Sequence, residues 1–215
     1  EGQLFQKFII KKFREKNIKT IGIIHTFLQP IPFNLFFEKT VCPNVIYVNS
    51  ISMKNCLTKH MNWKKKDILI KKSSRFSRKN KIDMKKKLFF PYEIPDLKKI
   101  EKVFINFVKL YKNKINLDLD VKIHPVKLKD KSHLNLKNKI LDILNKNRKY
   151  NKKIDKNLSV FFEYTSSIIE ALERGTKVIQ ICTEPTLQVY TPYIYKGIRI
   201  KKINKNIFEF NNGFY

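Results

Sequence analysis

Residues 158–182 read Leu158-Ser-Val-Phe-Phe-Glu-Tyr-Thr-Ser-Ser-Ile-Ile-Glu-Ala-Leu-Glu-Arg-Gly-Thr-Lys-Val-Ile-Gln-Ile-Cys182, and this stretch decides the fold. The short apolar run Leu158–Phe162 predicts a buried strand. The apolar residues of Ile168–Leu172 predict a helix, which ends at Gly175 because glycine readily takes the left-handed conformation. A second apolar run, Lys177–Cys182, predicts another strand. Strand, helix and strand in so short a space predict a βαβ crossover with parallel strands.

A polar turn lies between the first strand and the helix of this unit. Thr165, Ser166 and Ser167 place three hydroxyls at the predicted helix start, and Ser167 with Glu170 has the spacing of a capping box. Parallel sheets bind ligands at the carboxyl ends of their strands, and a helix N-terminus favours an anion. The turn is therefore predicted to be a phosphate-binding corner.

The same alternation of helix and strand patterns extends along the rest of the chain. Lys64–Lys87 is dense in Lys and Arg and is interpreted as a hinge, or as a loop beside a cleft. We therefore predict an α/β protein of two parallel-sheet domains, residues 1–80 and 81–215. The expected helices are Gln3–Arg14, a short one from Ser52, one capped by Asp96, and His133–Asn147; the expected strands are Thr20–Phe27, Asn44–Asn49, Asp67–Lys71, Leu88–Phe90, Leu117–Ile123 and an edge strand at Ile198–Ile203.

The charge of the chain is strongly basic. Its 215 residues carry 46 Lys and Arg against 18 Asp and Glu, a formal net charge of +28. Such an excess suits nucleic acid, anionic lipid or phosphorylated substrates. The lysines are dispersed and lack the aromatic interleaving of nucleic-acid modules, so most are interpreted as solvated surface and nucleic acid is not the expected partner.

The remaining composition bears on the cellular location. No apolar run approaches the roughly 20 residues that span a bilayer. The three cysteines have neither metal-binding nor disulfide spacing, which favours a reducing cytoplasm. The chain begins at Glu1 within an apparent helix, so we expect a fragment whose first domain is truncated. Cys182 is expected in the core, and His60 and His133 on the surface or a helix face.

Three short motifs each follow a predicted strand: Ile24-His25-Thr26, Ile123-His124-Pro125 and Thr165-Ser166-Ser167. With Glu170-Ala-Leu-Glu-Arg-Gly175 they resemble bacterial glycosyltransferases of surface-carbohydrate biosynthesis, which make capsule and lipopolysaccharide. The resemblance is to sialyltransferases and Kdo transferases with a His-Pro and a Ser-Ser motif. It implies the GT-B fold of two Rossmann-like domains, the first on the acceptor side and the second binding the nucleotide-sugar.

The resemblance also implies roles for individual residues. His124 would donate a proton or hydrogen bond to the donor phosphate, and Pro125 would fix the turn. Thr165, Ser166 and Ser167 would hold that phosphate, and Glu170 would accept hydrogen bonds from ribose hydroxyls. His25, on the other domain, would be the general base for the acceptor hydroxyl, since histidine titrates near neutral pH.

The expected reaction is transfer of a sugar, such as sialic acid or Kdo, from a CMP- or UDP-linked donor to a surface polysaccharide or lipid-linked glycan. No Asp-x-Asp metal motif stands at a strand end, so we expect no metal and no cofactor. We expect a cytoplasmic enzyme that touches the anionic inner membrane peripherally. The alternatives are a glycerol- or ribitol-phosphate transferase on the same scaffold, a basic nucleic-acid-binding α/β protein, and a non-catalytic carbohydrate-assembly domain.

Overall fold

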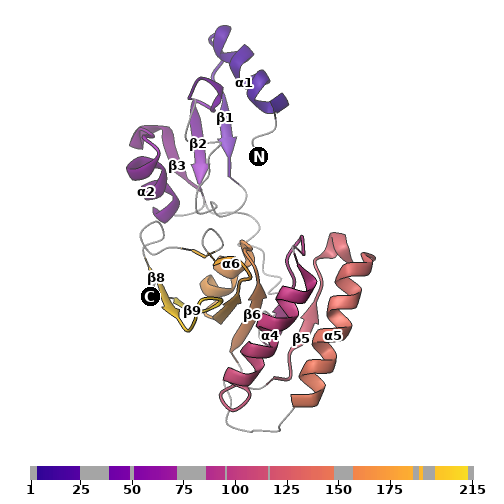
Figure 1. Ribbon diagram of the computed structural model, residues 1–215. Helices are drawn as coiled ribbons and strands as arrows, with labels where there is room; N and C mark the ends of the chain where they lie inside the picture. Colours follow the sequence, from indigo (N-terminus) through magenta and orange to yellow (C-terminus); the bar gives the residue numbers. More distant parts are fainter. Residues whose placement is uncertain are drawn as a thin grey trace. The chain divides into compact units, whose positions relative to one another are not determined.

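The computed structural model describes residues 4–24, 39–48, 51–71, 86–94, 96–115, 117–147, 157–185, 189–190 and 197–212. The chain divides into two compact units, one of residues 1–81 with 190–196 and one of residues 82–189 with 197–215. Each unit contains strands and helices in alternation, which confirms the predicted α/β class (Figure 1). The two units are described separately below.

The first unit has a parallel sheet in its described part. The strands are β1 (Ile21–Ile23), β2 (Val45–Val48) and β3 (Ile68–Ile70), in the order β1-β2-β3. Helix α2 (Ile51–His60) follows β2 and buries Met53, Cys56 and Leu57, as its apolar spacing predicts. It begins at Ile51, so Ser52 lies inside the helix and the prediction that Ser52 caps it is wrong.

Helix α1 (Leu4–Glu15) precedes this sheet. The predicted helix at Gln3–Arg14 therefore forms, but its apolar face is largely exposed: Phe5 is 71% and Phe8 57% accessible. Two 3-10 turns, η2 (Lys39–Val41) and η3 (Lys65–Asp67), complete the described elements of this unit.

The second unit is built on a mixed sheet that its described residues form in the order β5-β4-β6-β7-β9-β8. Strands β5, β4, β6 and β7 are parallel, and β9 lies antiparallel between β7 and β8. The bounds are β4 (Lys87–Phe89), α4 (Leu97–Tyr111), β5 (Asp120–Lys122), η4 (Pro125–Lys127), α5 (Lys131–Asn147), β6 (Leu158–Phe162), α6 (Ser167–Glu173), β7 (Lys177–Ile181), β8 (Ile198–Lys202) and β9 (Ile207–Asn212).

The unit Leu158–Cys182 folds as its sequence predicts. Strand β6 is buried along its whole length, and it pairs with β7 in parallel from Leu158↔Lys177 to Phe162↔Ile181. Gly175 ends the connection to β7 with a φ of +71°, the left-handed conformation expected of it. The edge strand predicted at Ile198–Ile203 is β8, and it does lie at the edge.

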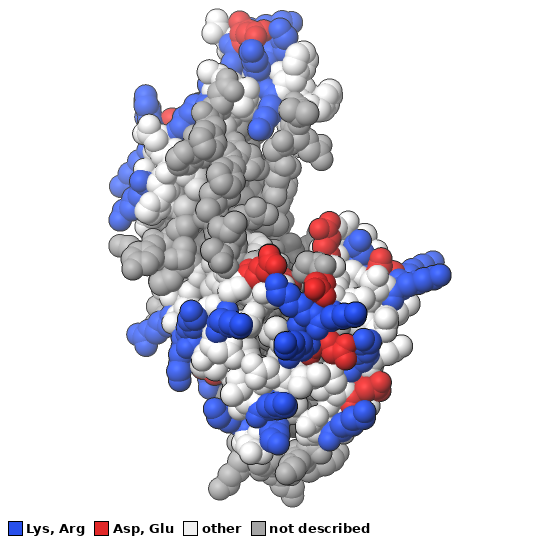
Figure 2. Space-filling view, viewed as in Figure 1, with Lys and Arg blue, Asp and Glu red and all other residues white. Residues whose placement is uncertain are grey.

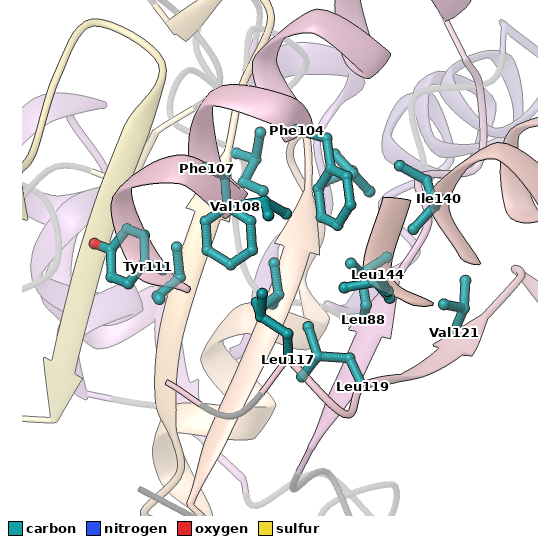
Figure 3. Close-up of a cluster of buried hydrophobic side chains, with 14 of the residues drawn as sticks. Leu88, Phe104, Phe107, Val108, Tyr111, Leu117, Leu119, Val121, Ile140 and Leu144 are labelled. Carbon is teal, nitrogen blue, oxygen red and sulfur yellow. The ribbon is translucent and has the colours of Figure 1, made fainter. Parts of the chain in front are cut away.

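The core of the second unit lies between the sheet and the helices α4 and α5. Asp96 caps α4 by accepting a hydrogen bond from the Lys99 N–H at 3.0 Å, as predicted. Figure 3 shows Phe104, Phe107 and Tyr111 of α4 turned toward the strands, with Ile140 and Leu144 of α5 beside them. The sheet contributes residues from five strands to this cluster: Leu88, Val121, Leu158, Val160, Phe162, Ile179, Ile181 and Ile207.

Charged side chains are spread over the surface. On the face in Figure 2, Lys and Arg lie in several separate groups, and acidic side chains are interspersed among them. Among the residues that the structure describes, no helix is both long enough and apolar enough to cross a bilayer. All three cysteines are buried, so the prediction that Cys182 is a core residue is confirmed.

Candidate functional site

The strand order of the second unit creates a topological switch point at β4. The chain runs from β4 to β5 on one side and then returns past β4 to β6 on the other. In open α/β sheets, ligands bind outside the carboxyl ends of the strands where the order reverses. Phe89 of β4 is level with Lys122 of β5 and with Phe161 of β6, so the segments that follow these strands leave the sheet at one edge. We call this the switch-point edge.

The switch-point edge brings together two of the three predicted motifs. His124 and Pro125 follow β5, and Thr165–Ser167 follow β6, with the end of β4 between them. Two interstrand spacings separate β5 from β6, which is about 10 Å. A nucleotide laid across the end of β4 is long enough to touch both. The third motif, at His25, lies outside the described residues.

His124 is held as a neutral hydrogen-bond donor. It precedes the 3-10 turn η4, in which Pro125 is the first residue, and the Val126 N–H donates to its Nδ1 at 3.4 Å. The proton of the neutral ring is therefore on Nε2. Partial burial lowers the pKa of His124, and the charges of His133 and Lys127 lower it further. At neutral pH the ring can donate a hydrogen bond from Nε2 to an anion.

One aromatic ring contacts the His124 ring, and a lysine side chain lies over that aromatic ring. The ring of Tyr92, which follows β4, lies 5.2 Å from it at an interplanar angle of 87°. The ammonium of Lys127 lies 4.7 Å from the centre of the Tyr92 ring. An aromatic ring, a neutral imidazole and a mobile cation therefore occupy one end of the switch-point edge.

His133 has a structural role in helix α5. It was expected on the surface or on a helix face; it lies on the helix but is 2% exposed, so the surface alternative is wrong. Its ring joins the start of α5 to the segment after β4. Nδ1 lies 2.9 Å from Asp130 Oδ1, and Nε2 lies 3.1 Å from the Pro91 carbonyl oxygen. The hydrogen bonds from His133 lower the pKa of Asp130. His60, in contrast, is exposed as predicted.

Replacing His133 by alanine is expected to reduce the free energy of unfolding by about 1–3 kcal/mol, because the Pro91 carbonyl loses its partner in a buried place. Urea denaturation followed by circular dichroism measures this. Asn135→Ala, at an exposed position of the same helix, is the control and should stay within about 0.5 kcal/mol of wild type. Equal stability of the two variants would contradict the structural role of His133.

The turn Thr165–Ser167 lies between β6 and α6, as predicted, but its hydrogen bonds differ from those expected. Helix α6 begins at Ser167, and Ser166 precedes it without a side-chain capping bond. The Ser167 N–H donates instead to Thr165 Oγ1 at 3.3 Å. The predicted capping box of Ser167 and Glu170 is therefore wrong. Oxygens of Thr165 and Ser166 already accept hydrogen bonds from backbone N–H groups of this first turn. The side-chain hydroxyls of Ser166 and Ser167 are therefore better candidates than these N–H groups for contact with an anion.

Glu170 is turned toward its own helix. It is 6% exposed, and its Oε1 accepts a hydrogen bond from Arg174 Nη2 at 2.6 Å. This i,i+4 ion pair is nearly buried on the glutamate side. The ion pair with Arg174 stabilises the charge of the buried Glu170 carboxylate. The predicted contact of Glu170 with ribose hydroxyls stays a prediction.

Glu163 lies at the same edge and was not among the residues predicted to form the site. It follows β6 directly and has a φ of +55°, a backbone conformation that is strained for a residue with a Cβ. The side chain is 4% exposed. Oε1 accepts from the Thr183 N–H at 2.9 Å and from its hydroxyl at 2.7 Å, whereas the buried Oε2 has no hydrogen-bond partner among the described residues.

The electrostatics of Glu163 favour its acid form. Burial raises the pKa of the carboxyl, the hydrogen bonds from Thr183 oppose the rise, and the charge of Glu184 adds to it while that of Lys99 offsets it. A strained, buried and incompletely paired carboxyl is a mark of functional sites. The sequence signal that points to it is an acidic residue placed directly after a strand in which four of the five residues are apolar.

Glu184 is held at the same edge by helix α4. Its Oε1 lies 2.9 Å from Lys99 Nζ, in the first turn of that helix. The hydrogen bond to Glu184 raises the pKa of Lys99. Both side chains are exposed, so the pair adds little stability but places a basic and an acidic group beside Glu163.

Within the described ranges, no three His, Cys, Asp or Glu side chains gather into a metal-ligand set. No protein-family profile, curated protein or solved structure matches the chain. The functional assignment therefore depends on the geometry and chemistry of the switch-point edge.

Proposed function

We propose that the protein is a glycosyltransferase of the GT-B type that transfers a sugar from a CMP- or UDP-linked donor to a bacterial surface polysaccharide or lipid-linked glycan. In this proposal the second unit binds the nucleotide and the first belongs to the acceptor side. The observation that supports it is the position of His124 and of the Thr165–Ser167 hydroxyls on either side of the switch-point strand.

The chemistry of these groups suits a departing nucleotide phosphate. As the bond to the sugar breaks, negative charge grows on the leaving oxygen, and donors fixed near it stabilise the transition state more than the ground state. His124 offers an Nε2–H that is already oriented by the bond from Val126 to Nδ1. Ser166 and Ser167 offer hydroxyls, and Lys127 offers a cation on a flexible stem.

Pro125, His25 and the membrane contact have supporting roles in this proposal. Pro125 sets the turn that carries the Val126 N–H to His124. His25 is the proposed general base for the acceptor hydroxyl, and the expected peripheral contact with an anionic membrane would bring the enzyme to lipid-linked acceptors. A glycerol- or ribitol-phosphate transferase using CDP-glycerol or CDP-ribitol would need the same phosphate contacts. An assay that offers each donor in turn shows whether the protein transfers a sugar or an alditol phosphate.

Thermal-shift titration with CMP, CDP, UDP and GDP tests the proposal. A nucleotide present at 100 times its Kd stabilises the folded state by about 2.7 kcal/mol, which raises Tm by a few degrees. We expect such a rise with CMP or UDP, and a Kd at least about tenfold weaker in His124→Ala, which corresponds to one lost charge-assisted hydrogen bond.

His60→Ala is the matched control, since His60 is an exposed histidine of the first unit. It should bind the nucleotide as the wild type does. A folded wild-type protein that binds none of the four nucleotides, but binds DNA or RNA with a steep salt dependence, would overturn the proposal in favour of a nucleic-acid-binding protein.

A further inference from the structure

Tyr92 is an unusual side chain for the unit in which it lies. It is 50% exposed, and in the second unit's described part it is the one exposed aromatic residue. The other described aromatic rings of that unit are buried or partly buried, as expected for side chains with so much apolar surface. An exposed ring at a ligand-binding edge therefore needs an explanation.

The place of Tyr92 in the fold is that of a ligand-contacting residue. It lies three residues after the end of β4, the strand at which the strand order reverses. Its ring is oriented by the edge-to-face contact with His124, the residue proposed to bind the phosphate. A ligand held by His124 is thus within reach of the ring.

The contact with Lys127 indicates which ligand the ring takes. The ammonium lies over the Tyr92 ring at 4.7 Å, where it is attracted by the negative charge of the ring face. Lysine has a flexible stem and three donors, so it can leave the ring and pair with an anion when one arrives. The pair therefore offers a flat apolar surface and a cation side by side.

We propose that Tyr92 stacks on the base of the bound nucleotide, and that Lys127 moves from the Tyr92 ring to the nucleotide's phosphate. The inference rests on the proposed function and adds a subsite to it, which is specific for a planar heteroaromatic ring bearing an anionic group. Base stacking on an aromatic side chain depends on the π-face and tolerates different bases, so CMP and UMP both fit.

The experiment compares a ligand with a base and a ligand without one. CMP binding is measured by isothermal titration calorimetry, and ribose 5-phosphate is measured by competition against CMP. Tyr92→Ala is expected to weaken CMP binding at least fivefold and to leave the affinity for ribose 5-phosphate within twofold of wild type. Ile105→Ala, an exposed apolar residue of α4 at 38% accessibility, is the control and should change neither affinity.

A second variant gives a direct signal for stacking. The chain has a single tryptophan, Trp63, which is buried in the first unit, so Tyr92→Trp adds one exposed reporter at the site. We expect this variant to keep its affinity for CMP and its fluorescence to be quenched by CMP but not by ribose 5-phosphate. Because Tyr92 is exposed, both variants should keep the wild-type Tm.

The outcomes separate this inference from the function on which it rests. If the wild type binds CMP and Tyr92→Ala binds it equally well, the stacking inference is overturned and the proposed function stands. If Tyr92→Ala weakens CMP and ribose 5-phosphate alike, the ring does not recognise the base and the inference is again overturned. If the wild type binds none of CMP, CDP, UDP and GDP, the proposed function and the inference fail together.

Discussion

Phe162→Ala is expected to destabilise the second unit by about 3–5 kcal/mol, the usual loss for a phenylalanine removed from a core. Phe162 is fully buried at the end of β6. Its ring centre lies 5.6 Å from that of Phe90 and 5.6 Å from that of Phe104 on α4. Alanine would leave a cavity where the central strand meets the helix, and both aromatic contacts would be lost. Chemical denaturation followed by circular dichroism measures the effect.

The control for this prediction is Leu110→Ala, on the outer side of α4 at 38% accessibility. It should change the free energy of unfolding by less than about 1 kcal/mol, because little apolar area is lost at a half-exposed position. A Phe162→Ala protein as stable as this control would contradict the placement of β6 at the centre of the core.

Glu163→Gln is expected to remove a pH dependence from the stability of the protein. In the unfolded chain the carboxyl ionises near the ordinary glutamate pKa of 4.5, whereas burial raises its pKa in the folded state. Between those two values the folded state holds a proton that the unfolded state has lost. The free energy of unfolding therefore falls as the pH rises through this window, by up to about 1.4 kcal/mol per pH unit. Glutamine cannot ionise, so the variant lacks this fall.

Urea denaturation of wild type and variant at pH values from 4 to 8 measures the difference. The stability of Glu163→Gln relative to wild type should increase with pH across the window. Glu93→Gln, at an exposed glutamate of the same unit, is the control and should run parallel to wild type. Parallel curves for Glu163→Gln as well would show that the Glu163 carboxyl titrates as an ordinary surface group, contrary to this account.

Local patterns in the sequence predicted much of the fold. The run Leu158–Phe162 predicted β6 with the bounds that the structure has, because four apolar residues in five, between polar neighbours, are typical of a short buried strand. Asp96 was predicted as the cap of α4, since a short acceptor side chain before an apolar helix pattern satisfies a free N–H. Both features depend on neighbouring residues alone.

Features that depend on distant residues were not predicted. Strand β9 (Ile207–Asn212) was missed, and it lies between β7 and β8 through antiparallel pairing with both. The position of β4 between β5 and β6 was likewise not stated, because no local pattern says which strands pair. That order is what brings the His-Pro and Ser-Ser motifs to one edge of the sheet.

The site shows the same division. The positions of His124 and Ser166 after strands followed from apolar periodicity. Other features of the site depend on contacts that the local sequence does not determine. The tautomer of His124 depends on Val126, the buried hydrogen bond of His133 on Pro91, and the environment of Glu163 on Thr183. The turns that bring these partners together cannot be inferred from composition. Asp130 three residues before His133 was the one sequence signal for the structural histidine.

The most direct test of the central claim is an NMR titration of the ¹⁵N-labelled protein with CMP, read at the backbone amides. We expect the amides of Tyr92, His124 and Val126 and those of Thr165–Ile168 to shift together with one Kd, because a single nucleotide touches both sides of the switch-point strand. Shifts confined to amides away from these two segments, or no shifts at all, would contradict the claim that the motifs form one nucleotide site.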